Sequence, residues 1–537
     1  MIFLWGSNAR DAHPIFFHHL LKGVRNGARL YVMDPRRTSS AAWADTWLGL
    51  RVGSDIALAN AMGRVIIHAG LANEEFIRRA TVDFETYRAA VEKYTLEYAE
   101  RETGVPADVI RDTALAYAKA DRGIICWTLG ITEHHNAVDN VFSLINLALL
   151  TGKVGRYGCG LNPLRGQNNV QGGGDMGAIP NRLSGFQDIL DADVRAKFEK
   201  AWKTTIQPHY GWDLTRMFHA MDEGKLTGLY VVGENPAQSD ADLHHVEKLL
   251  GGLDHLVVQD IFMTRTAELA HVVLPASSSW CESEGTVTNS ERRVQRCRKA
   301  LEPPGDAKDD IWIIAQIARR MGHDFGNPSP EDAWNEMRRL SPMFAGMSYT
   351  RLDACSGLQW PCYDEEHPGQ QFLHARLWSD EPGTLAPFHA AEHEPPIEQA
   401  DADYPFVLTT GRRLESYNTG VQSGGYDSPL HRGETVDISP EDAERLGVAE
   451  GEPMRVSSRR GSVVAPARID NALKPGLVFM TLHFPDQVAT NFLTIDAFDE
   501  KSGTAEFKAC AVNLEKVVQS SGKMRATTAV RPVGVEH

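Results

Sequence analysis

A loop rich in glycine and amide side chains carries the residue best suited to chemistry. Arg165 lies within residues 156–180, beside Gln167 and Asn168, in a stretch with almost no helical or strand periodicity. Long irregular loops are uncommon in compact domains unless they line a site. A guanidinium stays charged at any working pH and can hold a small carboxylate through two parallel hydrogen bonds. We therefore expect Arg165 to act in a site; the alternative is an ordinary loop arginine that faces solvent.

A second set of residues suited to ligand binding occurs twice. A turn glycine and a strand-ending aspartate lie 28 residues apart at Gly6 and Asp34, and 27 apart at Gly233 and Asp260. Small residues after a strand let backbone N–H groups approach a phosphate, and the aspartate can accept hydrogen bonds from ribose hydroxyls. Neither copy has a full G-x-G-x-x-G motif, so a purely structural turn explains either one alone. Two copies together favour a ligand with two nucleotide ends.

Both copies require the same strands and helices to position these residues. In each, an apolar run is followed by a glycine turn, a helix-like stretch and a second apolar run that ends at the aspartate. The first copy comprises residues 2–5, 15–24 and 28–33, and the second comprises residues 229–232, 244–250 and 256–259. This pattern predicts an α/β fold with two related Rossmann-like nucleotide-binding domains.

The remainder of the chain predicts a separate C-terminal domain. Short strand-like runs around a helix-like stretch at 440–446 are typical of a small β-barrel, and an acidic connection rich in Pro and His precedes them. The expected domains are a first dinucleotide-binding α/β domain at 1–167, a second at 168–330 with the substrate loop at its start, an irregular insert and linker at 331–403, the β-barrel at 404–517 and a tail at 518–537.

The composition excludes several function classes. The 537 residues include 55 Lys and Arg and 71 Asp and Glu, and the net charge of -16 would repel nucleic acids. No stretch approaches the roughly 20 apolar residues needed to span a membrane. The seven cysteines lie far apart without a C-x-x-C pair, which is typical of reduced thiols in a cytoplasmic protein and offers no metal-ligating cluster. The histidine pairs at 18–19 and 134–135 are expected to be exposed or to cap the core.

With these residues in view, the sequence resembles the molybdopterin oxidoreductase family and, within it, the catalytic alpha subunits of formate dehydrogenases. The most specific stretch is RGQNNVQG at 165–172, followed by DMGA at 175–178. Further motifs are VQDIFMTRTA at 258–267, EGTVTN at 284–289 and ATNFLT at 489–494. The resemblance covers essentially the whole chain except the tail.

The resemblance implies a cofactor and a reaction. The cofactor is a bis-molybdopterin guanine dinucleotide with molybdenum or tungsten, and the reaction is oxidation of formate to carbon dioxide with Arg165 as the catalytic residue. The C-terminal barrel is implied to be of the double-psi type. The implied cofactor-binding residues are Gly6, Asn8, Asp34, Arg36 and Asp55 in the first copy, Gly233, Asn235, Asp260, Thr264 and Thr266 in the second, Gln167 and Asn168 in the loop, and Arg412 and Asn491 in the barrel. The alternative for Asp55 is an ordinary acid in the first turn of a helix.

The sequence departs from the family at its start. Family members begin with four cysteines for a [4Fe-4S] cluster, followed by a cysteine or selenocysteine ligand to the metal, and this sequence has neither. Its first apolar run, at residues 2–5, also begins without a lead-in. The resemblance therefore implies a truncated catalytic subunit that needs the missing N-terminal segment or an electron-transfer partner subunit. The alternative is a non-catalytic subunit, a cofactor-binding scaffold in an electron-transfer complex.

Overall fold

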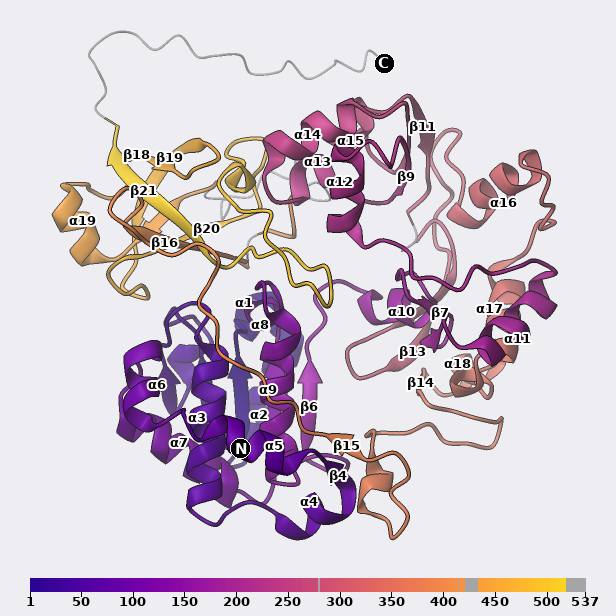
Figure 1. Cartoon of the computed structure of the whole chain (residues 1–537). Coiled ribbons are helices and arrows are strands. Elements are labelled where there is room, and N and C mark those ends of the chain that lie inside the picture. Colours follow the sequence, from indigo (N-terminus) through magenta and orange to yellow (C-terminus); the bar gives the residue numbers. More distant parts are fainter. Residues whose placement is uncertain (279–280, 415, 421–432, 518–537) are drawn as a thin grey trace, which may run out of the picture.

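A five-stranded parallel sheet forms the centre of the N-terminal domain in the computed structural model, which describes residues 1–278, 281–414, 416–420 and 433–517 (Figure 1). The expected tail at 518–537 lies outside the described residues. The strand order is β3-β2-β1-β5-β6. The strands are β1 (Ile2–Trp5), β2 (Leu30–Met33), β3 (Thr46–Leu48), β5 (Ile124–Trp127) and β6 (Gly160–Pro163).

Helices cover both faces of this sheet, which explains why β1 and β2 are apolar without alternation. Phe3 and Trp5 pack among α3, α7 and α9, whereas Leu4 packs on the opposite face against α2. The long helices are α2 (Pro14–Arg25), α3 (Asp55–His68), α7 (Ala107–Lys119) and α9 (Ala137–Leu150). The shorter ones are α1 (Ala9–Ala12), α4 (Glu74–Ala80), α5 (Phe84–Val91), α6 (Leu96–Thr103) and α8 (Leu129–Thr132).

A second, three-stranded parallel sheet repeats the start of the first. Its order is β11-β10-β9, which is the order β3-β2-β1 of the first sheet. The predicted repeat of two related α/β units is therefore confirmed. The strands are β9 (Gly228–Val232), β10 (His255–Asp260) and β11 (Val272–Pro275), and the helices of this unit are α12 (Leu214–Asp222), α13 (Pro236–Ser239), α14 (Leu243–Gly251) and α15 (Arg265–Glu268).

A small antiparallel sheet and its helices form a third core, in which Trp334, Phe344 and Trp360 are buried. Residues 331–403, expected to be irregular, contribute α17, α18 and β14 to it. Only Trp334 and Met337 of α17 are buried, too few to produce a helical period in the sequence. The elements of this core are β12 (Gly285–Thr288), β13 (Arg293–Cys297), β14 (Leu358–Gln359), α17 (Pro330–Leu340) and α18 (Tyr349–Ala354). The other helices between β6 and β14 are α10 (Val170–Asp175), α11 (Ala192–Trp202) and α16 (Asp310–Arg320).

The predicted C-terminal barrel is confirmed as a closed barrel of six strands, in the order β16-β20-β17-β19-β18-β21. Helix α19 (Pro440–Leu446) covers the residues predicted to be helical. In Figure 1 the barrel lies over the end of the first sheet where α1 and α8 are found. The strands are β16 (Phe406–Gly411), β17 (Val436–Ile438), β18 (Pro453–Ser457), β19 (Ser462–Ile469), β20 (Leu477–Thr481) and β21 (Cys510–Lys516). Among the described residues, none of the helices is long and apolar enough to cross a membrane.

Ion pairs fasten the barrel to the first domain. Lys508 Nζ lies 2.6 Å from Glu133 Oε2, and Glu506 Oε1 lies 3.1 Å from His135 Nδ1 and 3.6 Å from His134 Nδ1. The pair His134-His135 is thus largely buried against the barrel, whereas His18 and His19 are exposed. Because these contacts join segments far apart in the sequence, they set the position of the barrel above the sheet.

The charges in this contact perturb the pKa values of its members. Burial alone would raise the pKa of Glu506, but the two imidazoles lower it to about 2. The hydrogen bond to Glu506 in turn raises the pKa of His135. The carboxylate therefore stabilises the fold above its unfolded pKa near 4.5, and this stability is lost as the pH falls toward 2. The His135 contribution is present below about 6.5 and is lost as the pH rises through its raised folded pKa.

We expect Glu506→Gln to lower the free energy of unfolding by roughly 3 kcal/mol near pH 6, because it leaves two buried imidazoles without their carboxylate. Urea denaturation followed by circular dichroism measures the loss, and the difference from wild type should shrink at pH 3. Glu500→Gln, on an exposed side chain nearby, is the control. An equal effect of both variants would contradict the assigned contact.

Candidate functional site

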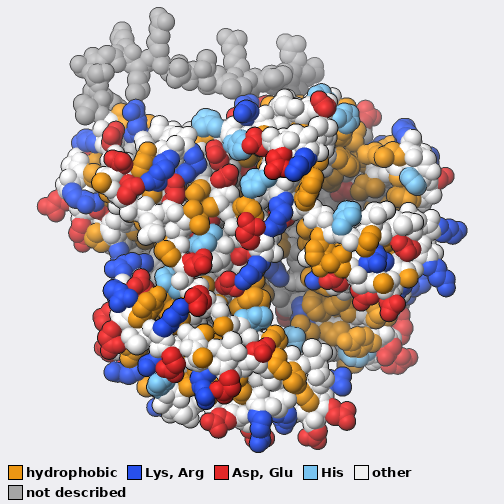
Figure 2. Space-filling view, viewed as in Figure 1, with side chains coloured by type: hydrophobic (Ala, Val, Ile, Leu, Met, Phe, Trp, Pro, Cys, Tyr) orange, Lys and Arg blue, Asp and Glu red, His pale blue; other side chains and the backbone are white. Residues whose placement is uncertain are grey.

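A cavity of about 710 Å³ lies where the first sheet, the glycine- and amide-rich loop and the barrel meet. The face shown in Figure 2 is hollowed between the N-terminal domain and the part of the molecule that contains the third core, with acidic and basic side chains interspersed around it. Of the residues predicted from sequence, those that line the cavity are Gly6, Asn8, Asp34, Arg36, Asp55, Arg165, Gln167 and Arg412. The structure thus brings together eight residues drawn from two expected domains, seven from the first α/β domain and Arg412 from the barrel.

The amide of Asn8 connects the segment that follows β1 to the segment that follows β2. We call these two segments the first half-site. Its Oδ1 accepts hydrogen bonds from Ser40 Oγ at 2.8 Å and Ser39 Oγ at 3.0 Å. Ser40 Oγ in turn accepts from the backbone N of Arg10 at 2.9 Å. The half-buried Asn8 side chain, together with the buried Ser40, therefore holds the start of α1 against the segment that follows Asp34.

The second copy repeats this connection. Asn235 Oδ1 accepts from Thr266 Oγ at 2.8 Å and from Thr266 N at 3.1 Å, and Thr266 Oγ accepts from the backbone N of Ala237 at 3.1 Å. Thr264 caps α15 by accepting from Ala267 N at 3.1 Å. Asn8 and Asn235 occupy equivalent positions, as do Ser40 and Thr266, which the sequence analysis did not pair.

The turn glycines also correspond. Gly6 N donates to Met33 O at 2.8 Å and Gly233 N donates to Gln259 O at 2.9 Å, and both glycines have positive φ, +55° and +63°. A Cβ on Gly6 would lie 2.7 Å from the backbone of Gly130, whereas a Cβ on Gly233 would meet nothing within 4 Å. Glycine is therefore required at position 6 by close approach as well as by conformation.

Several predicted residues do not line the cavity. Gly233, Asn235, Asp260, Thr264 and Thr266 belong to the second α/β unit, and Asn168 is exposed on the loop before α10. Asn491 is buried and donates to Ser239 O at 3.0 Å, so it joins the barrel to the second unit. The binding role expected for these residues stays a prediction; we refer to the segments after β9 and β10, which correspond to those after β1 and β2, as the second half-site.

Three of the predicted carboxylates are partly or fully removed from water. Burial raises the pKa values of Asp34, Asp55 and Asp260. Asp55 is the first residue of α3 and accepts a hydrogen bond from Trp5 Nε1 at 2.7 Å, so it is both a first-turn acid and a wall of the cavity. Each of these groups can accept hydrogen bonds from a ligand's N–H or hydroxyl groups.

The cavity also has a cationic side. Arg36, Arg412 and Lys508 line it, and the Arg36 guanidinium lies 3.5 Å from the centre of the Phe479 ring. Burial lowers the pKa values of Arg36 and Arg412, and both guanidinium groups stay charged. Acceptors for a nucleotide base or sugar and cations for a phosphate therefore meet in one cavity, which fits a nucleotide-bearing cofactor.

The second half-site has one buried oxygen that fits a ligand. Asp240, just after α13, keeps Oδ2 buried without a hydrogen-bond partner among the described residues. Burial and the nearby Glu234 raise the pKa of Asp240 to about 7. A buried acceptor without a partner is costly unless a ligand or water supplies a donor. Sequence analysis missed this residue because a lone aspartate after a short helix has no distinctive pattern.

Arg165 lies on the cavity wall, and its backbone is held from two directions. His13 Nε2 lies 2.7 Å from Arg165 O, and Arg165 N donates to Ser290 Oγ at 2.9 Å. Its Nε donates to Gln171 Oε1 at 3.2 Å. Among the described residues, no hydrogen bond or ion pair engages its two terminal nitrogens. The arrangement can present those nitrogens to a small carboxylate.

Gln167 joins the loop to the barrel. Its Nε2 donates to Asn418 Oδ1 at 3.0 Å, and Arg412 donates to the same oxygen. Within the described residues, no group of three or more His, Cys, Asp or Glu side chains is arranged to hold a metal ion.

The fold and site define the class: an enzyme fold with two nucleotide-binding α/β halves closed by a β-barrel. A family model described as Molybdopterin oxidoreductase matches residues 1–320, and one described as Molydopterin dinucleotide binding domain matches residues 406–511. The chain belongs to the molybdopterin oxidoreductase family, a family of oxidoreductase enzymes.

Individual relatives agree with this assignment. The alpha subunit of F420-dependent formate dehydrogenase 2 from Methanococcus maripaludis is 44% identical over 96% of this chain and 76% of its own length. Formate dehydrogenase H from Escherichia coli is 39% identical over 96% of this chain and 73% of its own length. Among solved structures, acetylene hydratase from Pelobacter acetylenicus matches with a TM-score of 0.71 at 20% identity, covering 96% of this chain and 78% of that one. The last match shows a shared fold.

We expect Ser40→Ala and Thr266→Val each to lower the free energy of unfolding by roughly 1–3 kcal/mol, because each leaves a buried backbone N–H without its acceptor. Urea denaturation of both variants tests the equivalence of the two copies. Ser379→Ala on the surface is the control and should change the value by less than about 0.5 kcal/mol. A large loss in one copy with none in the other would contradict the equivalence.

Proposed function

We propose that this protein oxidises formate to carbon dioxide, a proton and two electrons, HCOO⁻ → CO₂ + H⁺ + 2e⁻. The observation that carries the proposal is Arg165 on the cavity wall, with its terminal nitrogens directed to no partner among the described residues. A guanidinium binds a planar carboxylate through two parallel hydrogen bonds. The relatives named formate dehydrogenase support formate as that carboxylate.

The proposed cofactor is a bis-molybdopterin guanine dinucleotide with molybdenum or tungsten. When bound, it supplies the two-electron redox chemistry that side chains lack. Gly6, Asn8, Asp34, Arg36 and Asp55 would hold one dinucleotide, and Gly233, Asn235, Asp260, Thr264 and Thr266 the other. Gln167, Asn168, Arg412 and Asn491 would approach the pterins from the loop and the barrel. The acceptors and cations of the cavity, and the buried oxygen of Asp240, fit such a ligand.

The two electrons must leave through another group. We propose a partner subunit or a further segment that carries a [4Fe-4S] cluster, since the cysteines of this chain lie far apart as free thiols. The names of the relatives, as alpha subunits, support an assembly with further subunits, and we propose that this assembly is cytoplasmic. Copurification of an iron-containing polypeptide with this chain tests the proposal.

We expect Arg165→Ala to lower kcat/KM for formate at least about a hundredfold while leaving metal content unchanged, because the guanidinium binds substrate and transition state. The measurement combines formate-dependent dye reduction with metal analysis of the same preparation. Arg111→Ala, on the surface of α7, serves as the control. Loss of metal together with activity would show that Arg165 is structural.

We expect Asp55→Asn and Asp260→Asn to lower cofactor retention, because a neutral amide presents donors where the ligand's N–H or hydroxyl groups need acceptors. Guanine nucleotide released from purified, denatured protein measures retention. Asp108→Asn, in the first turn of α7, is the matched control. Full retention in both variants would remove these carboxylates from the cofactor site.

A further inference from the structure

A network of four hydrogen-bonded side chains leads from the cavity into the third core. Arg165 Nε donates to Gln171 Oε1 at 3.2 Å, and Gln171 Nε2 donates to Asp175 Oδ1 at 2.8 Å. From the other side, Trp360 Nε1 donates to Asp175 Oδ2 at 2.9 Å. Gln171, Asp175 and Trp360 are buried. We call these four residues the Asp175 network.

The chemistry of the side chains fixes which group donates and which accepts at each hydrogen bond of the Asp175 network. An indole nitrogen can only donate, so Trp360 requires an acceptor at Asp175. An ionised carboxylate can only accept, so Gln171 must turn its NH₂ group toward Asp175. The carbonyl oxygen of the same amide then faces Arg165, whose guanidinium can only donate. The ionised state of Asp175 thus decides which end of the Gln171 amide meets Arg165.

We propose that Asp175 is a positioning residue for substrate binding, which orients the Gln171 amide so that Arg165 presents its terminal nitrogens to the carboxylate of formate. The proposal rests on the proposed function for the identity of the substrate. Asp175 itself lies behind Arg165 and acts through it. A guanidinium anchored at Nε keeps both terminal nitrogens on one edge for a bidentate contact.

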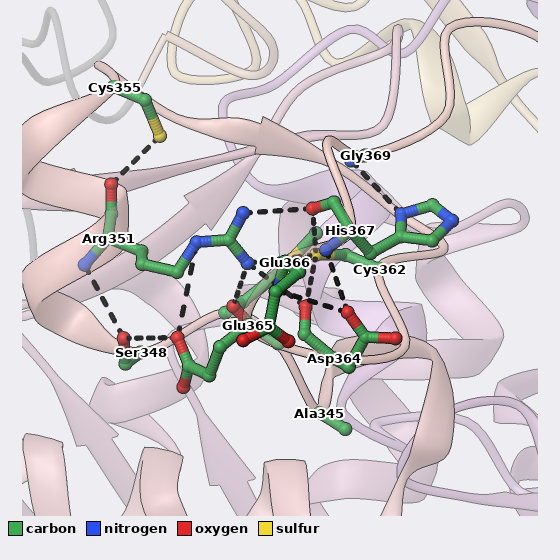
Figure 3. A network of polar contacts seen from close by, with 12 residues as sticks. Ala345, Ser348, Arg351, Cys355, Cys362, Asp364, Glu365, Glu366, His367 and Gly369 are labelled. Carbon is green, nitrogen blue, oxygen red and sulfur yellow. Dashed lines mark hydrogen bonds and ion pairs between the residues drawn. The ribbon is translucent and has the colours of Figure 1, made fainter.

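The far end of the network is anchored rigidly. Arg292 donates to Trp360 O and, at 2.9 Å, to Gln371 O, so it holds the backbone on both sides of Gly369. Figure 3 shows the second anchor, Arg351, whose guanidinium reaches the backbone of the same segment. Its Nη1 donates to Gly346 O at 2.6 Å and its Nη2 to His367 O at 2.8 Å. Trp360 is therefore a fixed donor, against which Asp175 is aligned.

Two cations face Asp175: Arg165 from the loop and Arg292 from the turn before β13. Thr288 of β12 and Trp360 are its uncharged neighbours on the other elements. Burial raises the pKa of Asp175 to about 6 despite the hydrogen bonds that favour the carboxylate. The network is therefore complete above that pH, and protonation of Asp175 as the pH falls lets the Gln171 amide turn over.

A pair of variants tests the direction of the network. In Asp175→Asn the new NH₂ group must face Gln171, which then turns its own NH₂ group toward Arg165. We expect kcat/KM for formate to fall at least about tenfold, mainly through KM. In the double variant Gln171→Glu with Asp175→Asn, the new carboxylate accepts from both neighbours, and kcat/KM should return to within about threefold of wild type. A merely structural role for Asp175 predicts no such rescue.

A matched pair of tryptophan variants controls for packing. Trp360→Phe removes the donor to Asp175, whereas Trp334→Phe, in the same core, removes a donor that bonds to Met347 O at 2.6 Å. We expect the first to raise KM for formate and to change its pH dependence below pH 6. The second should affect stability alone. Equal kinetic effects of the two variants would overturn the proposal.

A readout independent of turnover completes the test. In protein labelled with ¹⁵N-tryptophan, the indole N–H signal assigned through Trp360→Phe should shift with an inflection near pH 6, and Asp175→Asn should abolish the inflection. An unchanged Trp360 signal from pH 5 to 8 would overturn the proposal. A wild-type enzyme that fails to oxidise formate would instead overturn the proposed function and the substrate assigned here, while the indole signal still decides whether Asp175 holds Gln171 as described.

Discussion

The amides of Asn8 and Asn235 are the contacts on which the rest of the site depends. Each follows a turn glycine, where the first backbone N–H groups of a helix lack partners within the helix. Each amide oxygen accepts from a hydroxyl of the segment beyond the next strand, Ser40 or Thr266, which also takes one of those N–H groups. These hydrogen bonds hold the glycine turn and the segment beyond the next strand side by side in both copies.

The barrel supplies the remaining wall of the cavity. Acceptors from the first sheet form one side of the cavity, but Arg412 and Lys508 come from the barrel, and Phe479 of β20 stacks on Arg36. Their placement depends on the buried contact between Glu506 and the two histidines before α9. A cavity assembled in this way exists only when the two ends of the chain are docked together, so the interdomain contacts also determine the shape of the cavity.

Local sequence patterns predicted the repeated units, the barrel and helix α19. The strands are marked by short runs of apolar residues, and the start of α19 is marked by its cap, so each element could be recognised from its own residues. They failed where single large side chains do the packing, as with Trp334 and Trp360 in a segment expected to be irregular. The binding roles of the turn glycines and strand-ending aspartates stay predictions, of which Gly6 and Asp34 line the cavity, but these four residues were identifiable from their spacing. Ser40, Asp240 and Lys508 were not, since their roles arise only from tertiary neighbours.

The two half-sites share a backbone but differ in one side chain that decides their chemistry. Arg36 N and Phe262 N both donate to the strand-ending aspartate, at 2.9 and 3.2 Å, so the two residues are equivalent. Arg36 is a cation enclosed beneath the barrel, whereas the Phe262 side chain is 47% exposed. A repeat that kept its hydrogen bonds while exchanging a cation for an aromatic ring is therefore suited to two different contacts, one with an anionic group at Arg36 and one with an apolar surface at Phe262.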